Sequence, residues 1–240
     1  MVIKTDKINH KNLNINIKNS TDNNILLKDC SGQRYIASGL SDKNIVIEGI
    51  PGNALGSYLN GCNITVRGNV QDAVGDTMNA GNIYVHGSSG DATGYAMRGG
   101  KIFVEKDAGY RTGIHMKAYK EKLPVIVVGG STGSFLGEYQ AGGIIIVLGL
   151  NSEIEPPVGY FCATGMYGGK IYLRSNKLPV DLPVQIEGSK ATEKDMEEIE
   201  IYIDEFCNEF SYNKEEILSY NFYVLTPNKN IHYKQIYINN

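Results

Sequence analysis

The chain of 240 residues is 42% hydrophobic, and its 23 basic and 26 acidic residues give a formal net charge of −3. This near balance argues against a nucleic-acid or membrane-surface partner, and the length allows one or two domains. The longest apolar run, Ile144–Leu148, is too short to span a bilayer, and the N-terminal segment lacks the apolar core of a signal peptide. The cysteines form no C-x-x-C pair, which argues against a zinc site or an iron–sulfur cluster. Buried thiols in a cytoplasmic protein are expected at Cys30, Cys62, Cys162 and Cys207.

Residues 1–43 are expected to form an N-terminal cap and a first, irregular coil. They are polar, with short β-prone runs at Leu13–Ile17 and Ile25–Leu27. A cap is needed because the open strand edge at the end of a stack of strands would otherwise template aggregation.

Residues 44–175 contain an internal repeat, and each copy begins with a short β-prone run. The first inward isoleucine of each copy recurs every 19 positions at Ile45, Ile64, Ile83 and Ile102, and the same spacing separates Ile126 from Ile145. A repeat this short, with one strand in each copy, predicts a parallel β-solenoid of about seven coils. Alternate strand residues should point inward and stack, because one coil cannot bury its apolar side alone.

Glycines recur at fixed offsets in the copies, in the pattern G-x-x-G-x-x-x-G with a fourth glycine closing the unit. This is not a phosphate-binding P-loop, since no Gly-Lys-Ser/Thr and no helical pattern follow, nor a dinucleotide fingerprint, which needs one βαβ unit. The glycines are predicted to mark tight corners, where φ is positive or backbones approach closely. These structural glycines are Gly49, Gly52, Gly56, Gly61, Gly68, Gly75, Gly87, Gly90, Gly94, Gly99, Gly109, Gly113, Gly130, Gly133, Gly137 and Gly142.

The outward-facing strand residues form two different rows. One row is charged and is expected to face water: Glu48, Arg67, His86 and Glu105. The other is mostly apolar: Val46, Thr65, Tyr84 and Phe103. Strands that are apolar on both sides are normally buried on both sides, so another element should lie across the later coils.

Residues 176–240 supply that element. The segment Thr192–Phe210 predicts an amphipathic helix, because its apolar residues recur at spacings of three and four: Met196, Ile199, Ile203, Phe206 and Phe210. Thr192 followed by Asp195 resembles a capping box. Ser211–Leu218 is a candidate for a second short helix, and the residues from Phe222 onward are expected to form an extended tail lying on a surface, with a possible strand in it.

Two breaks interrupt the repeat, at residues 106–123 and at Leu150–Tyr167. Loops inserted in a regular solenoid tend to carry its specific contacts. Arg111, His115 and Lys117, in the first break, are therefore candidate contacts to an anionic ligand or a partner, and the alternative is a solvated basic loop.

No catalytic, cofactor-binding or metal-binding residue is predicted, because neither Ser/His/Asp nor Cys/His catalysis has a geometric anchor in the sequence. Asp72 and Asp91 precede equivalent corners and are predicted to accept hydrogen bonds in the turns.

The tandem copies GNALGSYLNGC, GDTMNAGNIYVHG, GDATGYAMRGGKIFV and ATGMYGGKIYLR resemble the C-terminal β-helix domain of the glutamate synthase large subunit, the GXGXG family, in a stand-alone version. The opening segment GQRYIASGL and the ending TPNKNIHYKQIY are similar too, so the resemblance covers nearly the whole chain. It implies a right-handed, single-stranded parallel β-helix that connects other components and binds no cofactor itself. The expected partners are an amidotransferase subunit and a synthase subunit that binds FMN and an iron–sulfur cluster.

Alternative functions remain open. The same repeat occurs in one of the subunits of formylmethanofuran dehydrogenase and in one of those of N-methylglutamate synthase, so the chain could serve a related complex. It could also be a small anion-binding enzyme that uses the 106–123 loop. A homo-oligomer is compatible with all of these hypotheses.

Overall fold

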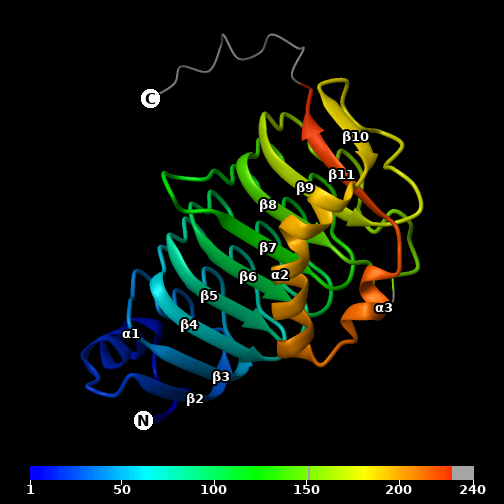
Figure 1. Cartoon of the computed structure of the whole chain (residues 1–240). Helices are drawn as coiled ribbons and strands as arrows, with labels where there is room; N and C mark the ends of the chain where they lie inside the picture. Colours follow the sequence, from blue (N-terminus) through cyan, green and yellow to red (C-terminus); the bar gives the residue numbers. More distant parts are fainter. Residues whose placement is uncertain (151, 229–240) are drawn as a thin grey trace.

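The computed structural model describes residues 1–150 and 152–228. The chain is mostly β, as expected, and its strands form one 11-stranded sheet with the order β1-β2-β3-β4-β5-β6-β7-β8-β9-β11-β10 (Figure 1). The strands are β1 (Val2–Lys4), β2 (Asn24–Ser31), β3 (Asn44–Ile50), β4 (Asn60–Arg67), β5 (Ala80–Val85), β6 (Gly100–Val104), β7 (Pro124–Val128), β8 (Ala141–Val147), β9 (Gly168–Arg174), β10 (Ile186–Lys190) and β11 (Phe222–Pro227). The helices in these residues are α1 (His10–Asn19), α2 (Glu193–Phe210) and α3 (Lys214–Leu218). None of them is long and apolar enough to cross a membrane.

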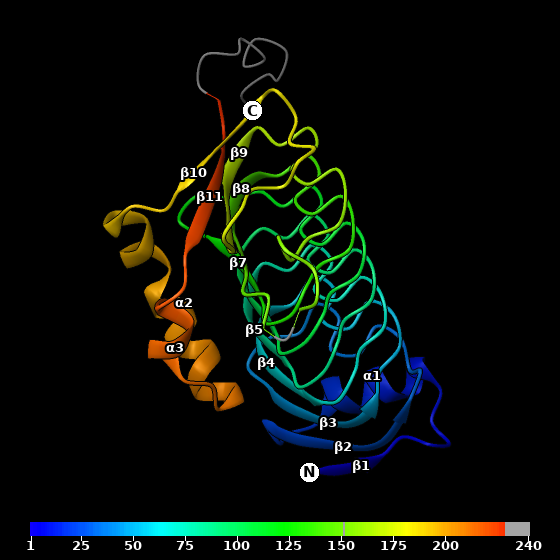
Figure 2. The same cartoon turned by 90° about the vertical axis from the view of Figure 1, so that its right-hand side faces the viewer.

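From β1 to β9, each strand pairs in parallel with the next strand in the sequence. The chain returns between strands through loops on the side of the sheet opposite α2 and α3 (Figure 2). The core lies between the sheet and these return loops. The 19-residue repeat therefore places equivalent residues of successive copies directly against one another.

The predicted inward column of isoleucines is confirmed. Ile45 pairs with Ile64 in the register of β3 and β4, and the pairing continues through the later strands. No member is more than 1% exposed. Burial of each such side chain is worth about 1.5 to 3 kcal/mol relative to exposure. The column consists of Ile45, Ile64, Ile83, Ile102, Ile126, Ile145 and Ile171.

The N-terminal segment Leu13–Ile17 is helical, so the prediction of a β-prone run there is wrong. Apolar residues alternate at Leu13, Ile15 and Ile17, which resembles a strand, but a helix uses only the two that lie one turn apart. Leu13 and Ile17 are fully buried and Ile15 is 55% exposed. Asn9 caps α1, and its side chain accepts a hydrogen bond from the amide of Asn12 at 3.0 Å. The second β-prone run, Ile25–Leu27, lies in β2.

The element expected across the later coils is α2, which begins where the capping box predicts. Thr192 and Asp195 make both reciprocal capping-box bonds. The apolar face of α2 packs on the outward residues of the later strands and forms a second core with them. From the sheet, this core includes Phe103, Val127, Ile146 and Tyr172, and from the helix Ile199, Ile203, Phe206 and Phe210.

Polar contacts at the rim hold α2 on the sheet. Tyr84 donates its hydroxyl to Glu205 at 2.7 Å, and Lys101 forms an ion pair with the same carboxylate. Burial and the bond to Glu205 raise the pKa of Tyr84, so this phenol stays a donor. His86 lies 2.9 Å from Glu209 of α2. His86 therefore faces water only in part, with 32% of its side chain exposed, because α2 extends over its strand end.

The C-terminal tail enters the sheet. β11 lies antiparallel between β9 and β10, with Phe222 opposite Arg174 and Tyr223 opposite Lys190. The possible strand in the tail is thus present, but it lies within the sheet and not on a surface. Residues 229–240, the rest of the expected tail, lie outside the described residues.

Asp195 gives the start of α2 a pH dependence. Burial by itself would raise the pKa of this carboxyl, but hydrogen bonds from the hydroxyl and amide of Thr192 and from the ammonium of Lys170 outweigh it and lower the pKa to about 2. An ordinary Asp in the unfolded chain titrates near 3.9. Because the pKa of Asp195 is lower in the folded chain than in the unfolded chain, its ionised carboxylate stabilises the fold at pH values above about 3.9. This contribution is lost as the pH falls toward 2.

We expect Asp195→Asn to lower the free energy of unfolding by about 1 to 2 kcal/mol at neutral pH. The difference between wild type and variant should shrink between about pH 4 and about pH 2, where the carboxyl becomes protonated. Urea unfolding at a series of pH values measures this difference. A difference that stays constant down to the lowest pH would show that the charge of Asp195 contributes nothing.

Candidate functional site

Each return loop contains three residues with positive φ at alternate positions. In one loop these are Ala92 at 55°, Gly94 at 72° and Ala96 at 49°. Only glycine adopts such angles without cost, and other residues lose roughly 1 to 2 kcal/mol each. Equivalent triplets are Tyr35, Ala37 and Gly39; Ala54, Gly56 and Tyr58; Ala73, Gly75 and Thr77; Arg111, Gly113 and His115; Phe135, Gly137 and Tyr139; and Phe161, Ala163 and Gly165.

Hydrogen bonds between neighbouring loops offset this strain. The amide of Ala54 donates to Asp72 O at 2.8 Å, and the amide of Ala73 donates to Asp91 O at 2.8 Å. Side chains add further hydrogen bonds between the loops. The Oδ1 of Asp72 accepts a hydrogen bond from the Asp91 amide at 3.0 Å, and the Oδ1 of Asp91 accepts one from the Tyr110 amide at 2.9 Å. The predicted turn hydrogen bonds of both aspartates are confirmed, and they join one loop to the next.

The predicted structural glycines lie in two kinds of surroundings, and three of them, Gly49, Gly61 and Gly142, lie inside strands and not at corners. The middle residue of each triplet faces the core, and a Cβ at Gly94 would lie 2.3 Å from the Cδ1 of Ile126. Others lie where neighbouring backbones meet, and a Cβ at Gly52 would lie 2.3 Å from Gly32 O. Gly61 has a φ of 126° but open space around it, so conformation alone favours glycine there.

Arg111 and His115 belong to the regular loops and not to an insertion. They continue the two columns that contain Ala92 and Ala96, 19 positions earlier. The amide of Lys117 likewise donates to Met97 O at 3.0 Å in the regular pattern. Only residues 118–123 depart from it, so the prediction of a break over 106–123 is too wide.

The segment that departs from the regular loops, residues 118–123, contains a small hairpin. The amide of Tyr119 donates to Lys122 O at 3.1 Å, and the amide of Lys122 donates to Tyr119 O at 3.0 Å. The loop before β7, drawn in green, extends beyond the loops of the neighbouring strands (Figure 1). It follows Lys117 directly in the chain.

The outer triplet positions form two columns of stacked side chains on the later loops. The guanidinium carbon of Arg111 lies 5.1 Å from the ring centre of Phe135, whose ring stacks on Phe161 at 5.0 Å. In the second column, the rings of His115 and Tyr139 stack at 5.2 Å, with an angle of 10° between them. The strand spacing of about 4.8 Å sets these separations.

These columns are exposed. Phe161 is 52% exposed and its neighbour Tyr160 is 70% exposed. In the first column the preceding loops carry the small residues Ala54, Ala73 and Ala92. Exposed rings also occur on the earlier loops, at Tyr35 and Tyr58, but the rings stack on one another in columns on the later loops. We call the columns, together with the neighbouring rings of Tyr95 and Tyr160, the aromatic edge: Tyr95, Arg111, His115, Phe135, Tyr139, Tyr160 and Phe161.

Of the predicted contact residues, Arg111 and His115 lie in the aromatic edge and Lys117 lies beside it. Arg111 is not a free cation, because its Nε donates to Glu138 at 2.9 Å. The aromatic partners were not predicted from the sequence. The signal was present, since Arg111, Phe135 and Phe161 occupy equivalent triplet positions, but longer loops separate them by 24 and 26 residues instead of 19.

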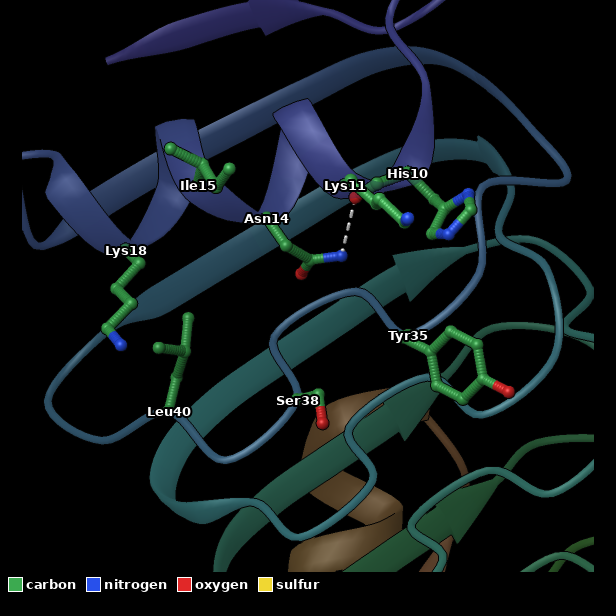
Figure 3. A pocket seen from close by; sticks show the side chains of 8 residues that line it. All are labelled: His10, Lys11, Asn14, Ile15, Lys18, Tyr35, Ser38 and Leu40. Atoms are coloured by element: carbon green, nitrogen blue, oxygen red, sulfur yellow. Dashed lines mark hydrogen bonds between the residues drawn. The ribbon is translucent and has the colours of Figure 1, made fainter.

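A pocket of about 290 Å³ lies between α1 and the first return loop (Figure 3). Asn14, in the middle of this surface, donates to His10 O at 2.8 Å and accepts from the Ala37 amide at 3.0 Å. It thereby fixes α1 on the loop. The lining residues are His10, Lys11, Asn14, Ile15, Lys18, Tyr35, Ser38 and Leu40.

The four cysteines are buried free thiols, as predicted. Burial raises the pKa of Cys30 to about 11 and that of Cys162 to about 12, so neither is a thiolate at neutral pH. In residues 1–150 and 152–228, no group of three or more histidine, cysteine, aspartate or glutamate side chains is placed to hold a metal ion.

Comparison with known proteins identifies relatives of nearly the whole chain. The model of a family described as GXGXG motif matches residues 2–228. The uncharacterized protein MJ1350 of Methanocaldococcus jannaschii is 44% identical over 221 residues, which cover 88% of this chain and 85% of that protein. A chain of the formyltransferase/hydrolase complex (FhcABCD) from Methylorubrum extorquens, solved in complex with methylofuran, has a TM-score of 0.64 and 20% identity, covering 84% of this chain and 72% of that chain. At this identity the likeness concerns the fold.

Proposed function

The chain belongs to the GXGXG motif family, and from this we propose that it is a non-catalytic structural subunit of an enzyme complex built from several different chains. The aromatic edge carries the proposal. Exposed aromatic rings at fixed spacing on a rigid frame provide large, ordered contact area of the kind that subunit interfaces use. The likeness to a chain from the formyltransferase/hydrolase complex supports the same role.

The more specific proposal is a right-handed β-helix of about seven coils, in which residues 1–43 cap the repeat of residues 44–175 and residues 176–240 cover it. In this role it would join an amidotransferase subunit to a synthase subunit that binds FMN and an iron–sulfur cluster, as in glutamate synthase. The alternative is a related complex of the N-methylglutamate synthase or formylmethanofuran dehydrogenase type. The formyltransferase/hydrolase neighbour supports this alternative at the level of fold.

Purification of the tagged chain from its own cells distinguishes these assignments. A glutamate-synthase-like complex should yield a glutaminase and a yellow flavoprotein with iron–sulfur absorbance. A formyl-transferring complex should instead yield subunits with formyltransferase or hydrolase activity. Recovery of the chain without any stoichiometric companion would contradict the proposed function.

The second candidate function is a small anion-binding enzyme that uses Arg111, His115 and Lys117. The contacts of Arg111 disfavour it, since its guanidinium is already held by Glu138 and Phe135. We therefore expect millimolar glutamine, glutamate or phosphate to leave the Tm unchanged within about 1 °C. A ligand present at 100 times its Kd would add about 2.7 kcal/mol and raise the Tm by several degrees. Such a rise in differential scanning fluorimetry would restore the enzyme hypothesis.

A further inference from the structure

Four cations gather where the aromatic edge meets the hairpin before β7. Arg98 and Lys117 occupy equivalent positions on neighbouring loops, 19 residues apart, so they lie one coil spacing from each other. Lys120 and Lys122 lie in the hairpin, and the stem of Lys122 packs beside Gly99. We call these four residues the basic patch.

The four cations of the basic patch outnumber its one carboxylate, that of Glu121, which lies between Lys120 and Lys122 in the hairpin. Within residues 1–150 and 152–228, no ion pair is formed by Arg98, Lys117, Lys120 or Lys122. Like charges on adjacent strands repel, so their clustering is a cost to the isolated chain. An opposite charge from outside the chain would remove that cost.

Two lysines on the α2 side of the molecule are neutralised within the chain. Lys170 lies 2.6 Å from Glu198, and Lys214 lies 2.8 Å from both Glu200 and Asp204. Other exposed lysines, such as Lys194, form no ion pair in the part of the chain that the structure describes, so what distinguishes the basic patch is that four unpaired cations gather beside the aromatic edge. Such a concentration of charge suits a contact with an opposite charge outside the chain.

The geometry of the aromatic edge favours carboxylates as the other half of that contact. The rings of His115 and Tyr139, and of Phe135 and Phe161, stack on each other, so each ring has at most one open face. A nucleic acid that binds by stacking needs free ring faces. Ring edges carry partial positive charge and suit acidic oxygens.

We propose that the basic patch and the adjoining aromatic edge dock an acidic surface of a partner subunit. The proposal rests on the proposed function, because it names the chemistry of one interface within such a complex. The hairpin bonds order the backbone that carries Lys120 and Lys122 before the partner arrives, which lowers the ordering cost of the contact. Charge complementarity of this kind should raise the association rate and fix the orientation of the partner.

The test uses the complex purified with the tagged wild-type chain. A water-soluble carbodiimide joins lysine amines to carboxylates in direct contact, and peptide mapping identifies the joined residues. We expect links from Lys117, Lys120 or Lys122 to aspartate or glutamate of a partner subunit. We also expect the triple variant K117E/K120E/K122E to retain that subunit at least tenfold less well.

A matched control carries the same charge change elsewhere. The variant K177E/K190E/K194E reverses three exposed lysines near the C-terminal end of the sheet and on α2, and it should retain the partner like wild type. Equal retention by both triple variants, links only between two copies of this chain, or release of the companion by nuclease would each overturn the proposal. If the wild-type chain retains no companion, the proposed function itself fails.

Discussion

Replacing Gly81 with alanine is expected to destabilise the chain by about 3 kcal/mol or more. Gly81 has a φ of 102°, and a Cβ there would lie 2.2 Å from Cys62 O and 3.0 Å from Cys62 N. Both are backbone atoms of the neighbouring strand, so no side chain can turn aside. The variant therefore combines backbone strain of about 1 to 3 kcal/mol with overpacking of a similar size.

Gly61→Ala separates the two effects. Its φ of 126° is similarly unfavourable, but the nearest atom to a new Cβ is the Cβ of Ser41 at 3.9 Å. We expect this control to lose only about 1 to 2 kcal/mol. Urea unfolding of both variants measures the difference. Equal losses would mean that the close approach of strands does not require glycine at Gly81.

Phe206→Ala is expected to cost about 3 to 5 kcal/mol and to loosen α2 selectively. The Phe206 side chain is fully buried between α2 and the sheet, and its ring lies where a Cβ on Gly129 would clash. Truncation of a buried phenylalanine leaves a cavity with this cost. Hydrogen exchange should show faster exchange in α2, while β2 to β4, outside its reach, keep their protection.

Ile201→Ala is the matched control for this prediction. Ile201 lies on the same helix but is 64% exposed, so its loss should change the free energy of unfolding by less than about 0.5 kcal/mol. If Phe206→Ala behaved like this control, α2 would not depend on its apolar face. If β2 to β4 lost protection together with α2, the two cores would unfold as one unit.

The strand register and the inward isoleucine column could be predicted from the sequence because the same 19-residue pattern recurs in successive copies. The 19-residue spacing sets the register of Ile45, Ile64 and Ile83, and a capping box marks the start of α2. The N-terminal helix was not predicted, because alternation at Leu13, Ile15 and Ile17 fits a strand as well as a helix. Whether this segment forms a helix or a strand depends on how Leu13 and Ile17 are buried against the first strands, which the segment itself does not reveal.

The candidate site could be predicted only in part. Arg111, His115 and Lys117 stand out as a basic group, but unequal loop lengths conceal that Phe135 and Tyr139 stack on them. The positive φ angles at the outer positions of each triplet could not be predicted from the sequence, because glycine, the residue that signals positive φ, mainly fills the middle position. Hydrogen bonds between neighbouring loops hold the outer residues in this conformation, and such bonds have no signature within a single copy.

The central claim is that this frame exists to hold other polypeptides. Native mass spectrometry of the untagged chain, isolated gently from its own cells, tests it most directly. We expect an assembly well above the 26.3 kDa of the chain, containing other polypeptides in fixed stoichiometry. A species at 26.3 kDa, or at simple multiples of it, would contradict the claim.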